Sequence, residues 1–492
     1  MKIYRFDKGI PVMLEEEMPE EISCTNIKIL APQCLKNLPN KKRLKKENFK
    51  ARIEDKCTYL NKEDTIYIGI GKEKITMGFS KLLGYKIGKK MLKMAKYEKP
   101  FLIYLKEIEK NNINLAKFLE GMKASDYRFD KYKSKKHDEF HLEVFLITDK
   151  IPEEEEVEKY IRELNVVQAI SDGVDITRDF VNEPPSNLSS LKYKEEVESI
   201  FKGLQKSEVV IYGEEELKNR GMNCHLAVNR ASVNEAMTIK ITYDPKIESQ
   251  EEIVLVGKGL TYDSGGLSLK SSSKMLSMKA DMAGSAVVLG IMSALERMEC
   301  KKKVVGYICL AENMVSGNAY KPDDVLKAAN GKTIHVKNTD AEGRLVLFDN
   351  LVLAEEENPN LDKIYSLATL TGSAVNQFGY EAAGMVGFNE KMKKELKKRG
   401  EETEEIWLNA EFHKYMLNSV EDDIADLSNT GTPNQGCQKA GLFLTKSLTK
   451  KTVKKYLHCD IAGPSFVDKS FGVNPKGATG WGVSSFLELL KK

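Results

Sequence analysis

Histidine is scarce in this sequence of 492 residues, and its cysteines form no recognisable pattern. The six His are dispersed and no H-E-x-x-H motif occurs, so a histidine-rich zinc site is not expected. The eight Cys are scattered without a C-x-x-C pair, which is typical of a reduced chain in the cytoplasm rather than of a disulfide framework. The sequence also lacks G-x-S-x-G, so it gives no sign of a nucleophilic serine on a strand-to-helix turn.

Long apolar runs and a strong net charge are absent as well. No run of about 18 or more apolar residues occurs, so no membrane span is expected. No N-terminal signal peptide is visible, because Met1–Arg5 leads into a mixed polar stretch. Lys and Arg exceed Asp and Glu by 76 − 73 = 3, a near balance that does not suggest a nucleic-acid or membrane partner. Two lysine-rich runs, residues 41–46 and 393–399, are expected to be solvated faces.

The length of the chain predicts two domains. In the N-terminal part, apolar spacing predicts strands at 65–70 and 144–147 and a helix at 81–94. Acidic residues at 153–156 then favour the start of a helix that should end near the breaker Pro184-Pro185. We place the domain boundary inside this helix, which gives a smaller N-terminal α/β domain (residues 1–165) and a second α/β domain (residues 166–492).

Strand and helix patterns alternate in the second part. Strands are expected at 253–256, 303–310 and 333–337, and helices at 280–298 and 344–356. This alternation predicts parallel strand pairs, and ligand chemistry in such domains lies beyond the carboxyl ends of the strands.

Carboxylates and lysines gather where these predicted strands end and helices begin. They are Lys258, Asp263, Lys270, Asp281, Asp340, Glu342 and Arg344. Four carboxylates in one place repel each other, and divalent cations would relieve that repulsion. A single Asp in a loop more often caps a helix or forms a turn, so only the joint pattern indicates a site for two metals.

Two shorter strings resemble motifs of other enzyme classes, but their surroundings in the sequence do not fit those motifs. Asp263-Ser264-Gly265-Gly266 is similar to the nucleophile segment of trypsin-like proteases, but that fold is all-β and this region is predicted to be α/β. Gly331-Lys332-Thr333 is similar to the end of a phosphate-binding loop, but the earlier glycine of that motif would fall at Leu326. Neither string is interpreted as a site.

The joint pattern matches a known family. Residues 338–345 read N-T-D-A-E-G-R-L, which resembles the signature of the leucyl aminopeptidase (cytosol aminopeptidase) family, and a bacterial member is expected. Other segments agree in order and spacing: V-G-K-G at 256–259, Y-D-S-G-G at 262–266, M-K-A-D-M at 278–282, A-T-L-T-G at 368–372, D-I-A-G-P at 460–464 and G-A-T-G at 477–480. The resemblance runs from about Arg178 to the C-terminus and is much weaker before that residue.

The resemblance implies a complete active site. The ligands of two divalent metals would be Lys258, Asp263, Asp281, Asp340 and Glu342, of which Asp263 and Glu342 would bridge. The catalytic residues would be Lys270 and Arg344. The substrate pocket would include Met278, Thr369, Leu370, Gly372 and Ala462. Such a site suits manganese or zinc and leaves cobalt and magnesium open.

The resemblance also implies an activity, an assembly and a fold. A hydroxide bridging the metals would hydrolyse the first bond of peptides with a free N-terminus, preferring Leu-like side chains broadly. Lys270 would stabilise the oxyanion, and Arg344 would hold a bicarbonate ion that moves the proton. The family usually forms a cytoplasmic homohexamer, for which we expect the N-terminal domain to serve assembly or regulation. Its catalytic domain has a central mixed β-sheet flanked by helices.

Some positions depart from the family pattern. Asp323 stands where Gly is usual, His335 where Glu is common, and Ser465 at a pocket-wall position that is often apolar, while 228–232 replace a Gly-containing turn. None is among the seven active-site positions, so they bear on side-chain preference rather than on the chemistry. The alternative function is DNA binding or assembly, alongside or instead of peptidase activity. The near-neutral charge and the lack of a recognisable DNA-binding motif disfavour DNA binding.

Overall fold

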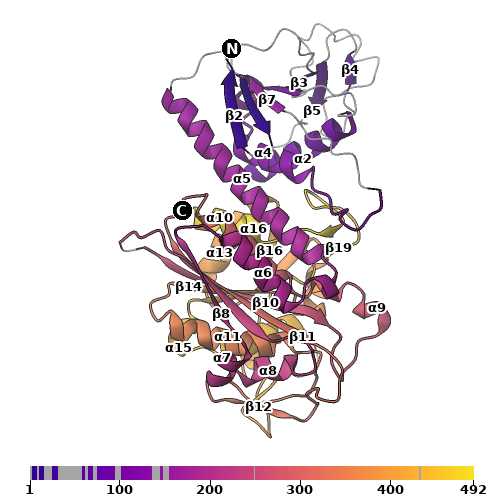
Figure 1. The fold of residues 1–492 in the computed structure, drawn as a ribbon, viewed down its shortest axis with the longest axis vertical. Helices are drawn as coiled ribbons and strands as arrows, with labels where there is room; N and C mark the ends of the chain where they lie inside the picture. The colour runs from indigo at the N-terminus through magenta and orange to yellow at the C-terminus, as the bar shows by residue number, and fades with distance from the viewer. Residues whose placement is uncertain are drawn as a thin grey trace. The chain divides into compact units, whose positions relative to one another are not determined.

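The computed structural model describes residues 3–7, 10–15, 25–30, 58–60, 65–69, 75–94, 101–135, 144–147, 154–248, 250–431 and 434–491 (Figure 1). The chain divides into two compact units. The first contains Met1–Ser171, Glu401–Glu404 and Gly472–Asn474, and the second contains Asp172–Gly400, Glu405–Phe471 and Pro475–Lys492. Helix α5 (Glu154–Asn182) supplies residues to both units, and the predicted boundary at residue 165 lies in this helix.

The first unit is built on a seven-stranded sheet with the order β2-β1-β7-β6-β3-β5-β4. Its strands are β1 (Ile3–Asp7), β2 (Ile10–Glu15), β3 (Thr25–Leu30), β4 (Thr58–Leu60), β5 (Thr65–Gly69), β6 (Phe101–Tyr104) and β7 (Val144–Ile147). Strands β3, β5, β6 and β7 pair in parallel, whereas β1, β2 and β4 pair antiparallel. Its helices are α2 (Met77–Met94), α3 (Leu105–Lys110) and α4 (Leu115–Ala124). The predicted strands at 65–70 and 144–147 are β5 and β7, with residue 70 outside the described residues, and the predicted helix at 81–94 lies within α2.

The second unit is built on an eight-stranded mixed sheet with the order β16-β15-β18-β14-β10-β11-β9-β8. Its strands are β8 (Ser207–Tyr212), β9 (Met237–Tyr243), β10 (Glu252–Asp263), β11 (Lys303–Asn313), β14 (Lys363–Ala368), β15 (Ala382–Val386), β16 (Ile406–Asn409) and β18 (Tyr456–Asp460). The central strands β18, β14, β10 and β11 run parallel. Their carboxyl ends therefore meet at one edge of the sheet.

Helices cover both faces of this sheet (Figure 1). The α-helices are α6 (Ser190–Phe201), α7 (Glu214–Asn219), α8 (Asn223–Asn229), α9 (Ser272–Met275), α10 (Ala283–Leu295), α11 (Gly343–Glu357), α12 (Gly372–Phe378), α13 (Glu390–Thr403), α14 (Gly436–Thr445), α15 (Lys450–Val453) and α16 (Val483–Leu490). Side chains of β10 alternate between the faces. Val254 and Val256 share a buried core with α11, whereas Gly257 lies against α10, where a Cβ would come within 2.6 Å of Gly284 O.

Short elements complete the second unit. They are strands β12 (Val325–Lys327), β13 (Thr333–His335), β17 (Leu427–Ser428), β19 (Phe466–Val467) and β20 (Gly477–Ala478), and 3₁₀ helices η3 (Pro185–Asn187), η4 (Met278–Ala280) and η5 (Lys414–Met416). The predicted α/β fold, with a central mixed sheet flanked by helices, is confirmed.

Two element boundaries that bear on the site differ from the prediction. Strand β10 does not end at Val256 but continues to Asp263, because its pairing with β11 persists past a register shift at Leu260–Tyr262. Asp281 does not start a helix but follows η4, and α10 begins only at Ala283. The lysine-rich run 393–399 lies in α13, and the run 41–46 lies outside the described residues.

One segment of the second unit, Ser272–Leu295, is long and apolar enough to pass as a membrane span by length and composition. However, 72% of its most apolar window is buried inside the fold. Helix α10, its main part, packs on β10, β11 and β14. Such burial is that of a core helix, so the segment gives no support for a membrane span.

Candidate metal centre and active site

Six of the predicted site residues converge near the carboxyl ends of the central strands. They are Lys258, Asp263, Lys270, Asp281, Asp340 and Glu342. Lys258 lies inside β10 and Asp263 is its last residue, and each is only 2% exposed. The pairing of β10 with β14 stops at Gly257 and Leu367, so the two strands separate where the site begins.

Lys258 lies at the centre of one half of this cluster. Its Nζ is 2.8 Å from Asp281 Oδ2 and 3.0 Å from Glu342 Oε1. It also donates to the carbonyl oxygen of Thr369 at 3.1 Å. The amine therefore joins residues from β10, from the end of η4, from the start of α11 and from the loop after β14.

Lys270 occupies the other half. Its Nζ lies 2.8 Å from Asp263 Oδ2 and pairs also with Asp340 Oδ1. The backbone N–H of Lys270 donates to Ser264 O, so the loop folds back on the end of β10. In this arrangement Lys270 faces two of the predicted metal ligands directly.

Three carboxylates are close enough to hold one ion. Ligand oxygens of Asp263, Asp340 and Glu342 lie within 4.8 Å of one another. Asp263 and Glu342 are buried, while the side chain of Asp340 is 33% exposed. Oxygen atoms from carboxylates are the ligands that hard and borderline divalent cations accept, so the donor set fits such an ion.

Gly343 provides the space through which Lys258 reaches the carboxylates. A Cβ at Gly343, the first residue of α11, would lie 2.3 Å from Lys258 Cε and 2.6 Å from its Nζ. Atoms cannot approach so closely, so any other residue at 343 would displace the lysine. The start of α11 and the position of Lys258 are thus fixed together.

The buried charged groups of the cluster shift one another's pKa values. Burial raises the pKa of Asp281 to about 8, and the charges of Asp263 and Glu342 add to the rise while Lys258 opposes it. Burial and then the charge of Asp263 likewise raise the pKa of Glu342. Burial alone would lower the pKa of Lys258, but Asp281, Glu342 and Asp263 outweigh it and raise that pKa. Together with Asp340, four carboxylates thus face only two ammonium groups.

Arg344 lies at the second position of α11 and is 9% exposed. Its Nη1 donates to the carbonyl oxygen of Asn429 at 3.0 Å. Its Nε is buried and has no hydrogen-bond partner among the described residues. Burial lowers the pKa of Arg344, which Glu342 and Asp460 partly offset. A buried guanidinium with a spare donor can hold an anion.

The predicted substrate residues lie on loops around the cluster. Thr369 Oγ1 donates to Asp281 Oδ1 at 2.9 Å. The backbone N–H groups of Leu370 and Ala462 both donate to Asp460 Oδ1, each at 3.2 Å. Gly372 starts α12, and Met278 starts η4, which packs against β10. Thr369 thus touches the cluster directly, and Leu370 and Ala462 are held near each other through one carboxylate.

Comparison with known proteins identifies the family to which this arrangement belongs. Residues 175–487 match the model of the cytosol aminopeptidase family, catalytic domain. The chain belongs to this family. It is therefore a peptidase, a hydrolase of the leucyl aminopeptidase type.

Curated relatives agree over most of their length. A probable cytosol aminopeptidase of Sulfurihydrogenibium sp. is 38% identical over 430 residues, which cover 86% of this chain and 83% of the relative. A probable cytosol aminopeptidase of Clostridium perfringens is 35% identical over 463 residues, which cover 91% of each chain.

Solved structures agree in fold with this aminopeptidase-family chain. A tomato leucine aminopeptidase mutant has a TM-score of 0.83 at 26% identity, covering 99% of this chain and 98% of its own. The bottromycin maturation enzyme BotP in complex with Mn has a TM-score of 0.82 at 25% identity, covering 95% of this chain and 98% of its own.

Several residues that support the site escaped the sequence prediction. Asn313, the last residue of β11, donates through Nδ2 to Asp263 Oδ1 at 2.9 Å and to Thr339 O at 3.0 Å. Asn429 accepts from Lys337 N at 2.8 Å through Oδ1 and donates to the carbonyl oxygen of Asn338. For Asn313 the signal was its position at a strand end beside β10, but for Asn429 the sequence offers none.

Two departures from the family pattern contact each other. His335 Nε2 is 3.2 Å from Asp323 Oδ1, and its Nδ1 is 2.9 Å from Asp422 Oδ1. Asp323 has a φ of 73°, in the left-handed region that favours the glycine usual at that position. The two substitutions are therefore in contact with each other, and within the described part of the chain neither side chain forms a hydrogen bond or ion pair with the carboxylate cluster.

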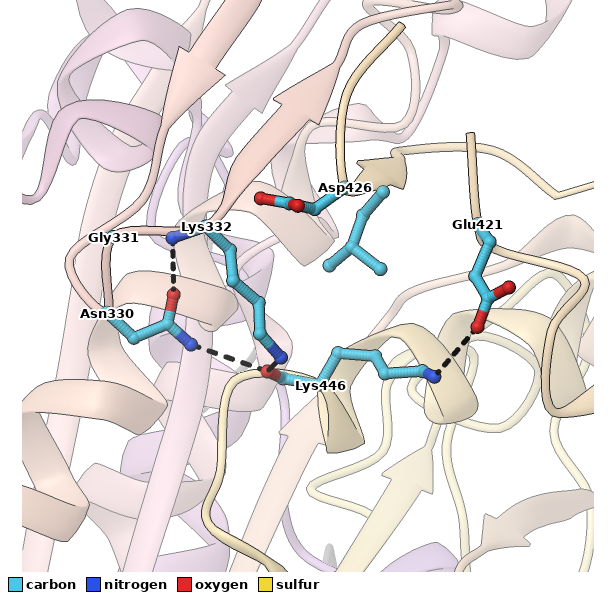
Figure 2. A pocket seen from close by; sticks show the side chains of 7 residues that line it. Asn330, Gly331, Lys332, Glu421, Asp426 and Lys446 are labelled. Carbon is cyan, nitrogen blue, oxygen red and sulfur yellow. Dashed lines mark hydrogen bonds and ion pairs between the residues drawn. The ribbon is translucent and has the colours of Figure 1, made fainter. Parts of the chain in front are cut away.

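A separate cavity of about 500 Å³ does not involve the cluster (Figure 2). Its lining residues are Asn330, Gly331, Lys332, Glu421, Asp426, Leu427 and Lys446. The charged groups are already engaged: Lys332 Nζ donates to Lys446 O at 2.8 Å, and Lys446 Nζ is 3.8 Å from Glu421 Oε1. Because none of its lining residues belongs to the predicted site, we do not assign the peptidase chemistry to this cavity.

Proposed function

We propose that this enzyme is a metal-dependent aminopeptidase that removes the N-terminal residue of peptides, with Leu-like side chains preferred and others tolerated. The observation that carries the proposal is the convergence of four carboxylates and two lysines near the carboxyl ends of the central strands. Membership in the cytosol aminopeptidase family supports the same reading.

Two divalent ions would be held by Lys258, Asp263, Asp281, Asp340 and Glu342, with Asp263 and Glu342 shared between them. Lys258 would bind as the neutral amine, because two adjacent dications would oppose the rise in its pKa that the carboxylates cause. The raised pKa values of Asp281 and Glu342 support this assignment, because cations would stabilise the ionised forms that burial disfavours. When bound, such ions supply an acidified water and polarise the peptide carbonyl. Manganese or zinc is proposed, with cobalt and magnesium as alternatives; a manganese complex is known for the related BotP structure.

The remaining charged residues would act on the reacting groups. Lys270 Nζ, which faces Asp263 and Asp340, would donate to the oxygen on which negative charge develops. Arg344 would hold a bicarbonate ion through its spare buried donor, and that ion would pass a proton to the leaving amine.

The substrate would be fixed at its N-terminus. The free α-amine would lie beside Asp281, and the first side chain would contact Met278, Thr369, Leu370, Gly372 and Ala462. Thr369, which bonds Asp281, supports a pocket adjoining the cluster. An amine that must be free restricts the enzyme to the end of a peptide.

We further propose that the chain acts in the cytoplasm as a homohexamer. Its N-terminal domain (1–165) would serve assembly or regulation and its catalytic domain (166–492) would carry the chemistry. The names of the curated relatives, cytosol aminopeptidases, support this location.

The test is a panel of aminoacyl p-nitroanilides, each supplied with a free or an acetylated α-amine. We expect leucyl p-nitroanilide to be cleaved fastest and acetyl-leucyl p-nitroanilide not at all, because an amide nitrogen is a poor substitute for the amine. Efficient cleavage of acetylated substrates, or of internal bonds in a longer peptide, would contradict the aminopeptidase assignment.

A further inference from the structure

A second buried carboxylate, outside the proposed metal ligands, organises the substrate loops. Asp460 is the last residue of β18 and is fully buried. Its Oδ2 accepts from Thr371 Oγ1 at 2.7 Å, and its Oδ1 accepts from the N–H groups of Leu370 and Ala462 at 3.2 Å each. Burial and then the charge of Asp460 raise the pKa of the nearby Cys437 thiol. One carboxylate thus satisfies donors from the loop after β14 and from the turn after β18.

These bonds fix the loop after β14 at points other than its contacts with the cluster. Ala368, where β14 ends, lies in register with Asp460 on the neighbouring strand. The next residue, Thr369, bonds Asp281 and Lys258, whereas Leu370 and Thr371 bond Asp460. The loop is therefore held between two buried acids. Ala462 is drawn to the same oxygen as Leu370, which sets the separation of the two segments.

A comparable acid elsewhere shows what a purely structural role looks like. Asp349, in the middle of α11, is also fully buried and accepts from the N–H groups of Cys224, His225 and Ala329 at 2.8–3.1 Å. None of these partners belongs to the proposed site. Both acids satisfy buried backbone donors, which would be unfavourable if left unpaired. Only Asp460 does so for segments that carry proposed substrate residues.

We propose that Asp460 is a positioning residue that sets the shape of the pocket for the substrate's first side chain, by holding Leu370 and Ala462 at a fixed separation. This inference rests on the proposed function, because it takes the pocket from there. Removing the carboxylate would release both segments at once and loosen the pocket. Substrates with a large first side chain fill the pocket. Their kcat/KM should then fall more than that of substrates with a small first side chain.

The test compares leucyl and alanyl p-nitroanilide in Asp460→Asn and Asp460→Ala. We expect the ratio of kcat/KM between the two substrates to fall roughly tenfold in Asp460→Ala, mainly through KM for the leucyl substrate, a size typical of side-chain discrimination in a pocket. Asp460→Asn, which keeps an acceptor, should lie between Asp460→Ala and the unaltered enzyme. Metal content, measured by mass spectrometry, should stay unchanged in both variants.

Milder variants keep the inference falsifiable if Asp460→Ala fails to fold. Thr371→Val removes the hydroxyl donor to Asp460, whereas Thr371→Ser keeps it. We expect the ratio to fall in Thr371→Val and to be restored in Thr371→Ser. Asp349→Asn is the matched control, in which thermal stability should fall while the ratio stays unchanged.

The outcomes separate the two proposals. An unaltered ratio in Thr371→Val and in every folded Asp460 variant, with activity lost equally on both substrates, would overturn the positioning role and leave the aminopeptidase intact. A shift of the ratio in Asp349→Asn as large as that in Asp460→Asn would also overturn it. If the unaltered enzyme cleaves neither free-amine substrate with any metal, the proposed function fails and the positioning role fails with it.

Discussion

Helix α11 carries two kinds of buried acid, and they differ in what surrounds them. At its start Glu342 faces Asp263, and Asp281 lies across Lys258, so acids face acids. In its middle Asp349 faces three backbone N–H groups. Burial raises the pKa of Asp349 to about 7, and that of Asp281 to about 8 with help from two other carboxylates.

The comparison shows that burial alone does not indicate a metal site. An acid whose oxygens are all met by N–H groups has its acceptors satisfied and lacks an empty place for a cation. An acid held against other acids gains from a cation, because the cation replaces repulsion by attraction. Convergence of like charges, rather than a perturbed acid by itself, is the informative feature.

The largest effect should come from removing the proposed metals. We expect a chelator to abolish hydrolysis of leucyl p-nitroanilide and added manganese, cobalt or zinc to restore it, because the clustered carboxylates need a cation. Asp349→Asn, which alters the other kind of acid, should respond to chelation and metal in the same way. Full activity in protein shown to be free of metal would end the two-metal proposal.

The next largest effect should separate the two lysines of the cluster. Lys270→Ala should lower kcat by about 10²–10³-fold, the loss typical of one donor to a developing oxyanion, and added metal should not rescue it. Lys258→Ala should lose metal instead, because its Nζ contacts Asp281 and Glu342, and excess metal should partly restore its activity.

Metal content by mass spectrometry, read beside kcat at rising metal concentration, distinguishes the two cases. If Lys270→Ala loses metal and is rescued while Lys258→Ala is not, the roles of the two lysines have been exchanged.

A smaller effect should appear in stability against pH. A carboxyl with a pKa of about 7 in the folded chain and roughly 3.9 when unfolded destabilises the fold as pH rises between these values, because the unfolded chain gives up the proton more easily. Asp349→Asn cannot titrate, so its Tm should decline less from pH 4 to pH 7 than that of the unaltered protein. Scanning calorimetry at constant metal concentration measures this, and parallel Tm profiles would show that Asp349 does not titrate in this window.

The smallest effect should come from the cavity of Figure 2. Lys332→Ala removes a side chain whose Nζ donates a hydrogen bond to Lys446 O. Neither residue belongs to the carboxylate cluster. We expect kcat/KM to stay unchanged, because none of the residues that line the cavity belongs to the proposed active site. A fall comparable to that of Lys270→Ala would connect this cavity with catalysis and weaken the contrast between the two regions.

The sequence predicts the acids of the cluster but not the asparagines that support the site, Asn313 and Asn429. Asp340 and Glu342 stand in one short string, and Asp263 comes soon after the predicted strand 253–256, so the convergence of these three could be inferred from strand ends, whereas Asp281 follows η4. The continuation of β10 to Asp263 could not be inferred, because polar Lys258 and Asp263 break the apolar pattern by which a buried strand is recognised.

The hydrogen bonds that support the site are harder still to predict from the sequence. Asn429 meets Lys337 and Arg344 across a long stretch of chain, and Asp460 meets Leu370 likewise. Such bonds depend on three-dimensional register, and no periodicity in the sequence encodes them. The α/β class could be predicted, because alternating strands and helices are a local property.

Gly343 shows that one residue of a sequence motif can be required by a residue that is distant in the sequence. In the string N-T-D-A-E-G-R-L, the glycine marks the place where the side chain of Lys258 crosses the start of α11, since any Cβ there would occupy the space of that side chain. The two positions should therefore be inherited as a pair. In a relative that lacks the lysine, glycine would no longer be required at position 343. Conversely, alanine at position 343 in a relative would indicate an altered metal centre before any activity was measured.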